Sequence, residues 1–280
     1  MLPRGIVLLF GSLLGRFAWL IMKRDRQRID KNLRLAYGSK FSANERHAIG
    51  KRFFIHTGKN IADIIRFKKH LRTELLPLIE VHGKENLDIA FAKGKGLIGV
   101  TGHLGNFELL AAYIASTGHP IAVIGRELYD KRIDALIVAN RQLAGLTQFY
   151  TTDSPKKILA WLKNNGGLGI LIDTDSDKVR NVSVPLFGHP NNTPVGQSVF
   201  GLRTGTALLP MCCVRISHNR YRVVIKPAVP LPEGDNFDEN VYAVTAACMQ
   251  ELQEMIDTYK DQWIWLHNRW PDLIPPESKK

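Results

Sequence analysis

A histidine and a glutamate flank a short glycine-containing turn, a pairing that could perform acid–base chemistry. His103 and Glu108 lie within the run Thr101-Gly-His-Leu-Gly-Asn-Phe-Glu108. In a continuous helix, residues five apart point about 140° away from each other, but a turn between them lets their side chains converge. A carboxylate in contact with an imidazole fixes its tautomer, so the other ring nitrogen can take a proton from a hydroxyl. Because no serine accompanies the pair, the pattern predicts a base that activates a substrate alcohol.

The sequence around this pair predicts a junction between a strand and a helix. The apolar run at 97–100 is typical of a buried strand, Gly102 breaks it, and Asn106 is a suitable helix N-cap. The apolar face of the following helix would comprise Leu109, Leu110, Tyr113 and Ile114. We therefore expect His103 at the carboxyl end of a strand and Glu108 in the first turn of a helix. A histidine beside glycines is more often structural, so its place at the junction is what favours catalysis.

The order of the later segments predicts an α/β fold with a mixed, mostly parallel sheet flanked by helices. Strand-like runs near 78–81, 97–100, 121–124, 148–150 and 168–172 alternate with helical stretches near 84–93, 107–116, 130–144 and 155–164. A loop-rich segment at 176–197 follows, and then a helix that reaches Gly205. The remaining elements would be a hairpin of strands at 207–216 and 221–227 and a last helix at 237–260.

Four further charged residues are expected near the edge of the sheet where ligands of such folds bind. Arg126 follows the third predicted strand, Asp173 and Asp175 follow the fifth, and Arg141 lies on the helix between them. The arginines could hold a phosphate or a carboxylate, or form structural salt bridges. The aspartates could bind a metal or cap a loop. The spacing of the His–acid pair is poor for zinc, and we predict no metal site.

The first residues predict a membrane-associated segment. Residues 5–22 are strongly apolar apart from Arg16, and Lys23, Arg24, Arg26 and Arg28 follow. The run barely reaches the ~20 residues that a span needs, and its heavier charge lies behind it, unlike in a secretory signal. We predict an N-terminal helix at 1–28 that lies in or on the membrane, with its basic cluster on anionic headgroups, and a main domain at 29–280. The alternative is a buried helix of the main domain.

The composition indicates an anionic partner. The chain of 280 residues is 45% hydrophobic and carries a formal net charge of +12. Nucleic acid, an anionic membrane and an acidic protein or substrate could each match that charge. We find no helix-turn-helix, RNA-binding or zinc-finger signature, and the apolar N-terminal segment favours a membrane over nucleic acid. The three cysteines make no disulfide framework, which favours a reducing compartment.

Five blocks resemble, in the same order, the lipid A biosynthesis acyltransferases, which are the lauroyl and myristoyl transferases of the wider glycerolipid acyltransferase superfamily. The first, His103-Leu-Gly-Asn-Phe-Glu108, is similar to the family's His-x4-Asp/Glu signature. The others are Gly125-Arg126-Glu-Leu, Asn140-Arg141-x-x-x-Gly145, Ile172-Asp173-Thr-Asp175 with Val184-Pro-Leu-Phe-Gly188 and Thr193-x-x-Gly196, and Gln262-Trp263-x-Trp265-x-His-x-Arg269-Trp270. The chain departs from the family at Thr174, where Gln is usual, and at Gly125, where Tyr is common. These departures bear on the identity of the acceptor more than on the type of reaction.

The resemblance implies a membrane-associated O-acyltransferase that needs no cofactor. His103 would be the general base on an acceptor hydroxyl, and Glu108 would orient it and stabilise the imidazolium. The hydroxyl would attack a fatty acyl thioester, carried by acyl carrier protein or by coenzyme A. The family's fold is the α/β fold that the strand and helix patterns also predict.

The resemblance also implies roles for the other charged residues and a location. Arg126 and Arg141 would hold an anionic acceptor or support the catalytic pair, and Asp173 and Asp175 would bind sugar hydroxyls or brace an arginine. The expected acceptor is a glycolipid precursor of lipid A at the cytoplasmic face of the inner membrane. The alternatives are another lipid acceptor, such as a phosphatidylinositol mannoside or an aminolipid, and a non-enzymatic basic protein bound to a membrane.

Overall fold

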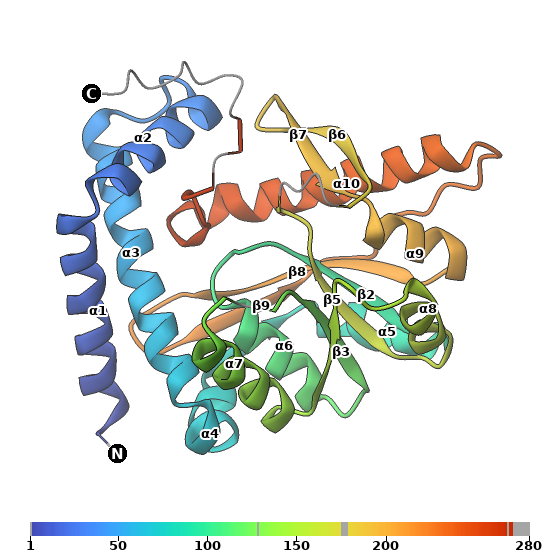
Figure 1. Cartoon of the computed structure of the whole chain (residues 1–280), viewed down its shortest axis with the longest axis horizontal. Helices are drawn as coiled ribbons and strands as arrows, with labels where there is room; N and C mark the ends of the chain where they lie inside the picture. The colour runs from blue at the N-terminus through green and yellow to red at the C-terminus, as the bar shows by residue number, and fades with distance from the viewer. Residues whose placement is uncertain (1, 128, 175–178, 268, 271–280) are drawn as a thin grey trace.

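A computed structural model of the chain describes residues 2–127, 129–174, 179–267 and 269–270, which fold around a seven-stranded sheet (Figure 1). Its strands, in the spatial order β1-β9-β8-β2-β5-β3-β4, are β1 (Ile79–His82), β9 (Tyr221–Ile225), β8 (Ala207–Arg215), β2 (Leu97–Thr101), β5 (Gly167–Leu171), β3 (Ile121–Gly125) and β4 (Leu146–Tyr150). Neighbouring strands are parallel except β8 and β9, which are antiparallel. The prediction of a mixed, mostly parallel sheet is confirmed.

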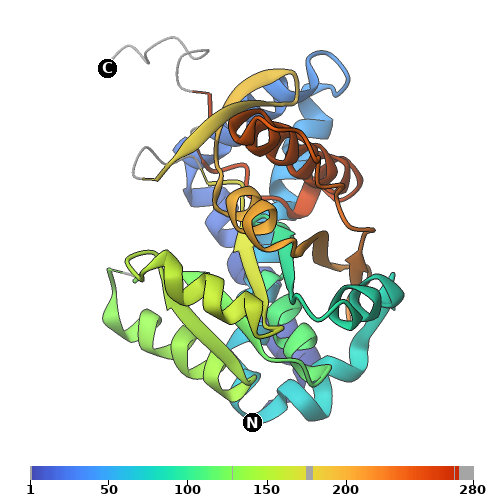
Figure 2. The same ribbon diagram turned by 90° about the vertical axis from the view of Figure 1, so that its right-hand side faces the viewer.

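Helices cover both faces of the sheet (Figures 1 and 2). On one face lie α4 (Phe67–His70), α5 (Lys84–Ala92), α6 (Phe107–Ser116) and α7 (Lys131–Leu143), and on the other α8 (Pro155–Lys163), α9 (Gly196–Thr204) and α10 (Phe237–Thr258). Short π-helical and 3-10 turns occupy Leu71–Leu75, Leu76–Leu78 and Lys260–Gln262. Side chains alternate along β8, so Cys212 packs in one core layer and Met211 in the other.

The helix start predicted at Asn106 is confirmed, and a second capped start lies at Ser42. The Asn106 side chain accepts a hydrogen bond from the Leu109 amide and caps α6, so Glu108 lies in the first turn as expected. Ser42 and Glu45 form the reciprocal capping box that begins α3 (Ala43–Ile65).

The segment that we expected to be loop-rich contains a two-stranded hairpin instead. β6 (Asn181–Leu186) and β7 (His189–Pro194) pair in antiparallel fashion, with Pro185 opposite Pro190. Proline is uncommon inside sheets because it cannot donate to the ladder, but each strand of a two-stranded sheet is an edge strand and tolerates it. The prolines therefore concealed the strands in the sequence.

The N-terminal helix is held against the fold along its length. α1 (Arg4–Ile21) lies beside α3, and α2 (Lys23–Tyr37) connects the two, so the predicted boundary at residue 28 falls inside a helix (Figure 1). Gly11, Gly15 and Gly58 let the two backbones touch: a Cβ on Gly58 would lie 2.1 Å from the Gly11 carbonyl oxygen. By length and composition, α1 is the one helix in the described residues that could cross a membrane, although 33% of it is buried in the fold.

A buried polar cluster ties the start of α1 to the sheet. The fully buried Asp63 accepts hydrogen bonds from Arg4 at 2.8 Å, Arg215 at 2.8 Å and the Tyr221 hydroxyl at 2.7 Å. Burial alone would raise the pKa of the Asp63 carboxyl, but the two guanidinium groups outweigh it and lower that pKa. From the same cluster, the Asn60 amide donates to the Gly105 carbonyl at 2.9 Å, which connects α3 to the loop that carries His103.

Contact between α1 and α3 can be tested with two alanine variants. Gly58→Ala should lower the free energy of unfolding by about 1–3 kcal/mol, because the new methyl group forces the two backbones apart. Gly5→Ala is the matched control, since Gly5 lies on α1, the other helix of the pair, and a Cβ there would have nothing within 4 Å. Denaturant unfolding measures both variants, and equal stability of the two would contradict the close packing.

Candidate active site

The imidazole of His103 is paired with Asp173 from the neighbouring strand. Thr101 of β2 lies opposite Leu171 of β5. His103 and Asp173 each lie two residues beyond these strand ends. His103 Nδ1 lies 2.9 Å from Asp173 Oδ1, and the His103 backbone N–H donates to Asp173 Oδ2 at 2.9 Å. A Cβ on the intervening Gly102 would lie 2.9 Å from Oδ2, so glycine permits this approach. An ionised carboxylate only accepts hydrogen bonds, so the proton of neutral His103 resides on Nδ1 and leaves Nε2 as the base.

The Asp173 carboxylate is held as an anion by donors from the C-terminal segment. It is fully buried, accepts from the Trp263 indole N–H at 2.9 Å, and lies 3.3 Å from the Arg269 guanidinium. That guanidinium also donates to the Asp173 backbone carbonyl and lies over the Trp263 ring, 4.2 Å from its centroid. Burial by itself would raise the pKa of Asp173, but the positive charges and hydrogen bonds of His103 and Arg269 hold that pKa well below its ordinary value.

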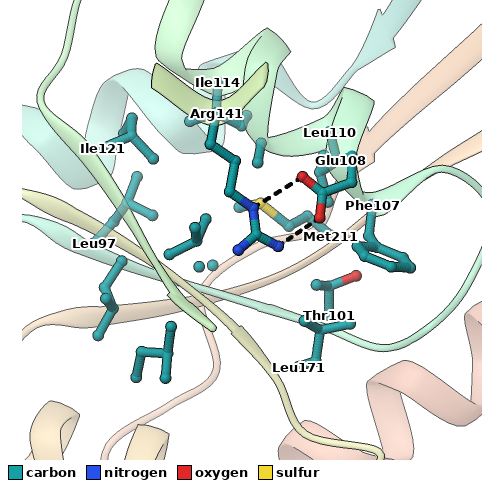
Figure 3. Close-up of a pocket in the computed structure, with 16 residues that line it drawn as sticks. Leu97, Thr101, Phe107, Glu108, Leu110, Ile114, Ile121, Arg141, Leu171 and Met211 are labelled. Carbon is teal, nitrogen blue, oxygen red and sulfur yellow. Dashed lines mark hydrogen bonds and ion pairs between the residues drawn. The ribbon is translucent and has the colours of Figure 1, made fainter. Parts of the chain in front are cut away.

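Glu108 does not occupy the place that we expected beside His103. Its carboxylate receives two hydrogen bonds from Arg141, one of them from Nε at 3.0 Å, in the bidentate geometry that arginine favours (Figure 3). Arg141 also donates to Gln148 of β4 at 3.0 Å. Asp173 already occupies the Nδ1 side of the imidazole, and Glu108 on α6 is directed towards α7. The structure therefore corrects the expectation: Glu108 braces Arg141, and Asp173 orients His103.

The remaining predicted residues divide into three groups. Arg126 is exposed just beyond β3 and has no ion-pair partner in the described residues. Arg141 is engaged by Glu108 and Gln148. Asp175 lies outside the described residues. Gly125, where the family often has Tyr, lies under Arg141: a Cβ there would be 2.8 Å from the guanidinium, so a larger side chain would displace it.

The Trp-rich segment, of which the structure describes residues 262–267 and 269–270, contributes more to the site than the sequence indicated. It runs beside the loop at 102–106 between β2 and α6, which carries His103 and is called the catalytic loop below. The Gly105 amide donates to the Gln262 carbonyl at 2.9 Å, and the Ile264 amide donates to the His103 carbonyl at 3.2 Å. Trp263 is fully buried, which favours core packing over a membrane-interface belt. The motif is recognisable in the sequence, but nothing in its pattern reveals that it lies against the loop.

A second imidazole faces the first. The His267 ring lies 5.5 Å from that of His103, centroid to centroid, and one of its nitrogens is 3.2 Å from Arg269. Burial, followed by the positive charges of Arg269 and His103, lowers the pKa of His267 to about 4. His267 is therefore neutral at pH 7, so it adds no second positive charge beside the base.

A narrow apolar pocket of about 50 Å³ lies between α6 and strands β2, β3 and β5 (Figure 3). The Arg141–Glu108 pair and Phe107 line it, and the Phe107 ring also contacts that of His103 at 5.3 Å between centroids. Gly99 and Gly169 leave the strand surface open there. The other lining residues are mostly apolar, among them Leu97, Leu110, Ile114, Ile121, Leu168 and Met211. Such a lining suits an alkyl chain.

Comparison with known proteins identifies the family. The profile described as bacterial lipid A biosynthesis acyltransferase matches residues 1–272. The chain belongs to this family. It is also 24% identical to the phosphatidylinositol mannoside acyltransferase of Mycobacterium tuberculosis (strain ATCC 25618 / H37Rv) over 194 residues, which are 68% of this chain and 59% of that protein. The enzyme of the same name from Mycolicibacterium smegmatis is 24% identical over 209 residues, 70% of this chain and 66% of that protein. The match thus spans about three fifths to two thirds of the length of these relatives.

No metal centre accompanies the site within the ranges that the structure describes. No group of three or more His, Cys, Asp and Glu side chains there is placed to hold a metal ion. The geometry that is present, an imidazole hydrogen-bonded to a buried carboxylate, is one that can accept and return a proton.

The low pKa of His267 predicts how stability depends on pH. An unfolded chain binds a proton at this histidine below about pH 6.5, whereas the folded chain does so only below about 4. The free energy of unfolding should therefore fall as pH falls from 6.5 to 4. Burial also lowers the pKa of His56 to about 4, so this histidine contributes to the pH dependence of stability in the same direction. We expect His267→Gln to lose part of this pH dependence in denaturant unfolding at pH 7.5 and 5; an unchanged dependence would refute the assignment.

Proposed function

We propose that this protein is a membrane-associated O-acyltransferase that moves a fatty acyl chain from a thioester to a hydroxyl of a membrane lipid. The observation that carries the proposal is the His103–Asp173 pair beside an apolar pocket, in a chain of an acyltransferase family. The His103 side chain is 24% exposed, so an acceptor hydroxyl can reach Nε2. The site offers no serine or cysteine nucleophile among these residues, so the acceptor hydroxyl itself attacks.

The proposed reaction needs one base and balances without a cofactor. His103 Nε2 takes the proton of the acceptor hydroxyl as its oxygen attacks the thioester carbonyl carbon. The C–S bond of the tetrahedral intermediate then breaks, and the imidazolium returns the proton to the departing thiolate. The products are an ester and a free thiol. Asp173 keeps Nδ1 protonated and stabilises the imidazolium between the two steps.

In this proposal the apolar pocket takes the acyl chain. Its lining comes from both α6 and the sheet, and Phe107 lies between it and the base. Met211 borders the pocket, and the flexible thioether side chain of methionine adapts to a guest more easily than a branched one. A chain in this pocket would leave its thioester carbonyl near His103.

The acceptor that we favour is a glycolipid precursor of lipid A, which the family description supports. A phosphatidylinositol mannoside is the second candidate, because the curated relatives carry that name. The exposed Arg126 would bind a phosphate or carboxylate of the acceptor. Acyl carrier protein or coenzyme A would carry the donor chain, and the protein would act at the cytoplasmic face of the inner membrane.

Mass spectrometry of reaction products tests the function. Purified protein would be incubated with acyl carrier protein and coenzyme A thioesters and with each glycolipid acceptor. We expect an acceptor whose mass rises by one acyl group, together with release of the free thiol. If neither acceptor received an acyl group from either donor, the proposed substrates would be refuted.

The roles of the two carboxylates can be separated by conservative variants. Asp173→Asn should lower kcat about 10²–10⁴-fold, since the amide no longer fixes the tautomer or stabilises the imidazolium. Glu108→Gln leaves the His103–Asp173 pair intact but replaces the charged partner of Arg141 with a neutral one. It should therefore lower thermal stability and retain more acyl transfer than Asp173→Asn. Transfer rates and melting temperatures of both variants provide the measurement. A larger loss of kcat in Glu108→Gln would return the orienting role to Glu108.

The size of the pocket should set the preferred acyl length. Gly99→Ala places a methyl group 2.9 Å from the Met211 sulfur, so it narrows the pocket and should shift preference to shorter donors. Met211→Ala widens the same space and should favour longer donors. Competition between thioesters of different lengths measures both shifts. Identical length preferences in the two variants would show that the chain binds elsewhere.

A further inference from the structure

A basic cleft opens at the C-terminal end of α1, separate from the pocket beside His103. It has a volume of about 980 Å³ and lies between α2 and the start of α3, with Trp19 of α1 in its wall. Only one acidic residue, Asp30, is among the residues that line it. The basic residues of its lining are Lys23, Arg24, Arg26, Lys31, Arg34 and Arg46, together with His47.

The fold uses only some of these charges. Arg46 donates to Asp30 at 2.7 Å, and Arg34 lies 3.3 Å from the same carboxylate. Arg26 donates to the backbone carbonyls at the end of α1. In contrast, the side chains of Lys23, Arg24 and Lys31 form no ion pair or hydrogen bond with any described residue. Like charges gathered in one cleft repel each other, so the fold gains nothing from these three.

The cleft continues directly into the exposed apolar face of α1. Leu20 is 70% exposed and Ile21 62% exposed, and they precede the cleft residue Lys23 by one turn or less. Leu9, Leu13, Leu14 and Phe17 extend this face along the helix. The glycine contacts hold the opposite face of α1 against α3. The outer face of α1 is therefore not covered by α3 (Figure 1). An apolar strip with a basic cleft at its end matches a ligand that has an anionic head and an apolar tail.

We propose that this cleft binds the phosphate headgroups of anionic phospholipids, while the outer face of α1 enters the acyl region of the same leaflet. α1 then lies along the membrane instead of crossing it. An acidic protein would match the cations of the cleft but not the apolar strip, so the lipid is favoured. The inference rests on the proposed membrane location and adds the binding site.

The cleft also lies close to the catalytic site. On the side of α2 away from the cleft, Asn32 donates to the backbone carbonyls of Trp265 at 2.7 Å and His267 at 2.9 Å. One helix, about 10–12 Å across, therefore separates the cleft from the segment that carries His267. A headgroup in the cleft would hold the catalytic loop at the membrane surface, where a lipid acceptor resides.

The test compares two triple variants of equal charge loss in co-sedimentation with vesicles. One is Lys23→Gln/Arg24→Gln/Lys31→Gln. The control is Lys93→Gln/Lys156→Gln/Lys163→Gln, whose exposed lysines lie at the end of α5 and on α8, at the other end of the molecule from α1 (Figure 1). Vesicles contain phosphatidylcholine alone or with phosphatidylglycerol. Each basic residue near an anionic bilayer adds about a fivefold gain in binding, so the cleft variant should lose about 100-fold on the anionic vesicles.

Four results bear on the inference, one that supports it and three that overturn it. A large loss for the cleft variant, a small one for the control and little change on neutral vesicles would support it. Equal losses for the two variants would overturn it, as would unchanged binding of the cleft variant. So would a loss of binding to acyl carrier protein with vesicle binding intact, because the partner would then be a protein. Melting temperatures confirm that the variants are folded, and transfer in detergent reports separately on the proposed function.

Discussion

The buried carboxylate of Asp173 is the interaction on which the site depends. A buried charge costs several kcal/mol unless it is paired and hydrogen-bonded. Asp173 meets this requirement with the backbone and ring of His103, the indole of Trp263 and the guanidinium of Arg269. The donors come from the loop after β2 and from the C-terminal segment. One anion therefore joins three parts of the chain that are distant in the sequence, and it holds the base in position as it does so.

Two other buried anions have a different task. Glu108 holds Arg141 between α6, α7 and β4, and Asp63 holds Arg4 and Arg215 between α1, α3 and β8. Each is paired with guanidinium groups and touches neither nitrogen of His103. These clusters fix the scaffold around the catalytic loop, and of the three carboxylates only Asp173 contacts the imidazole of His103. The separation explains how one family motif can contain a carboxylate that shapes the site without contacting the imidazole.

Much of this arrangement could be predicted from the sequence, but the partner of the histidine could not. Strand ends placed His103 and Asp173 at one edge of the sheet, and the cap at Asn106 placed Glu108 on a helix. Which carboxylate meets the imidazole depends on β2 lying next to β5, an order set by long-range packing. The same is true of the Trp-rich segment beside the loop. By contrast, the spacing of Gly11 and Gly15 is typical of close helix packing, and this was a signal that our predictions did not use.

We infer from the geometry that Asp173 fixes the proton of His103 on Nδ1 and leaves Nε2 free to act as base. Nitrogen-15 NMR of the imidazole, with histidine labelled in the whole protein and His103 assigned by substitution, observes the tautomer directly. We expect the neutral form of the His103 imidazole to be protonated at Nδ1 in the native protein and to be a mixture of tautomers in Asp173→Asn. A native His103 protonated at Nε2, or a tautomer unchanged by Asp173→Asn, would contradict this inference.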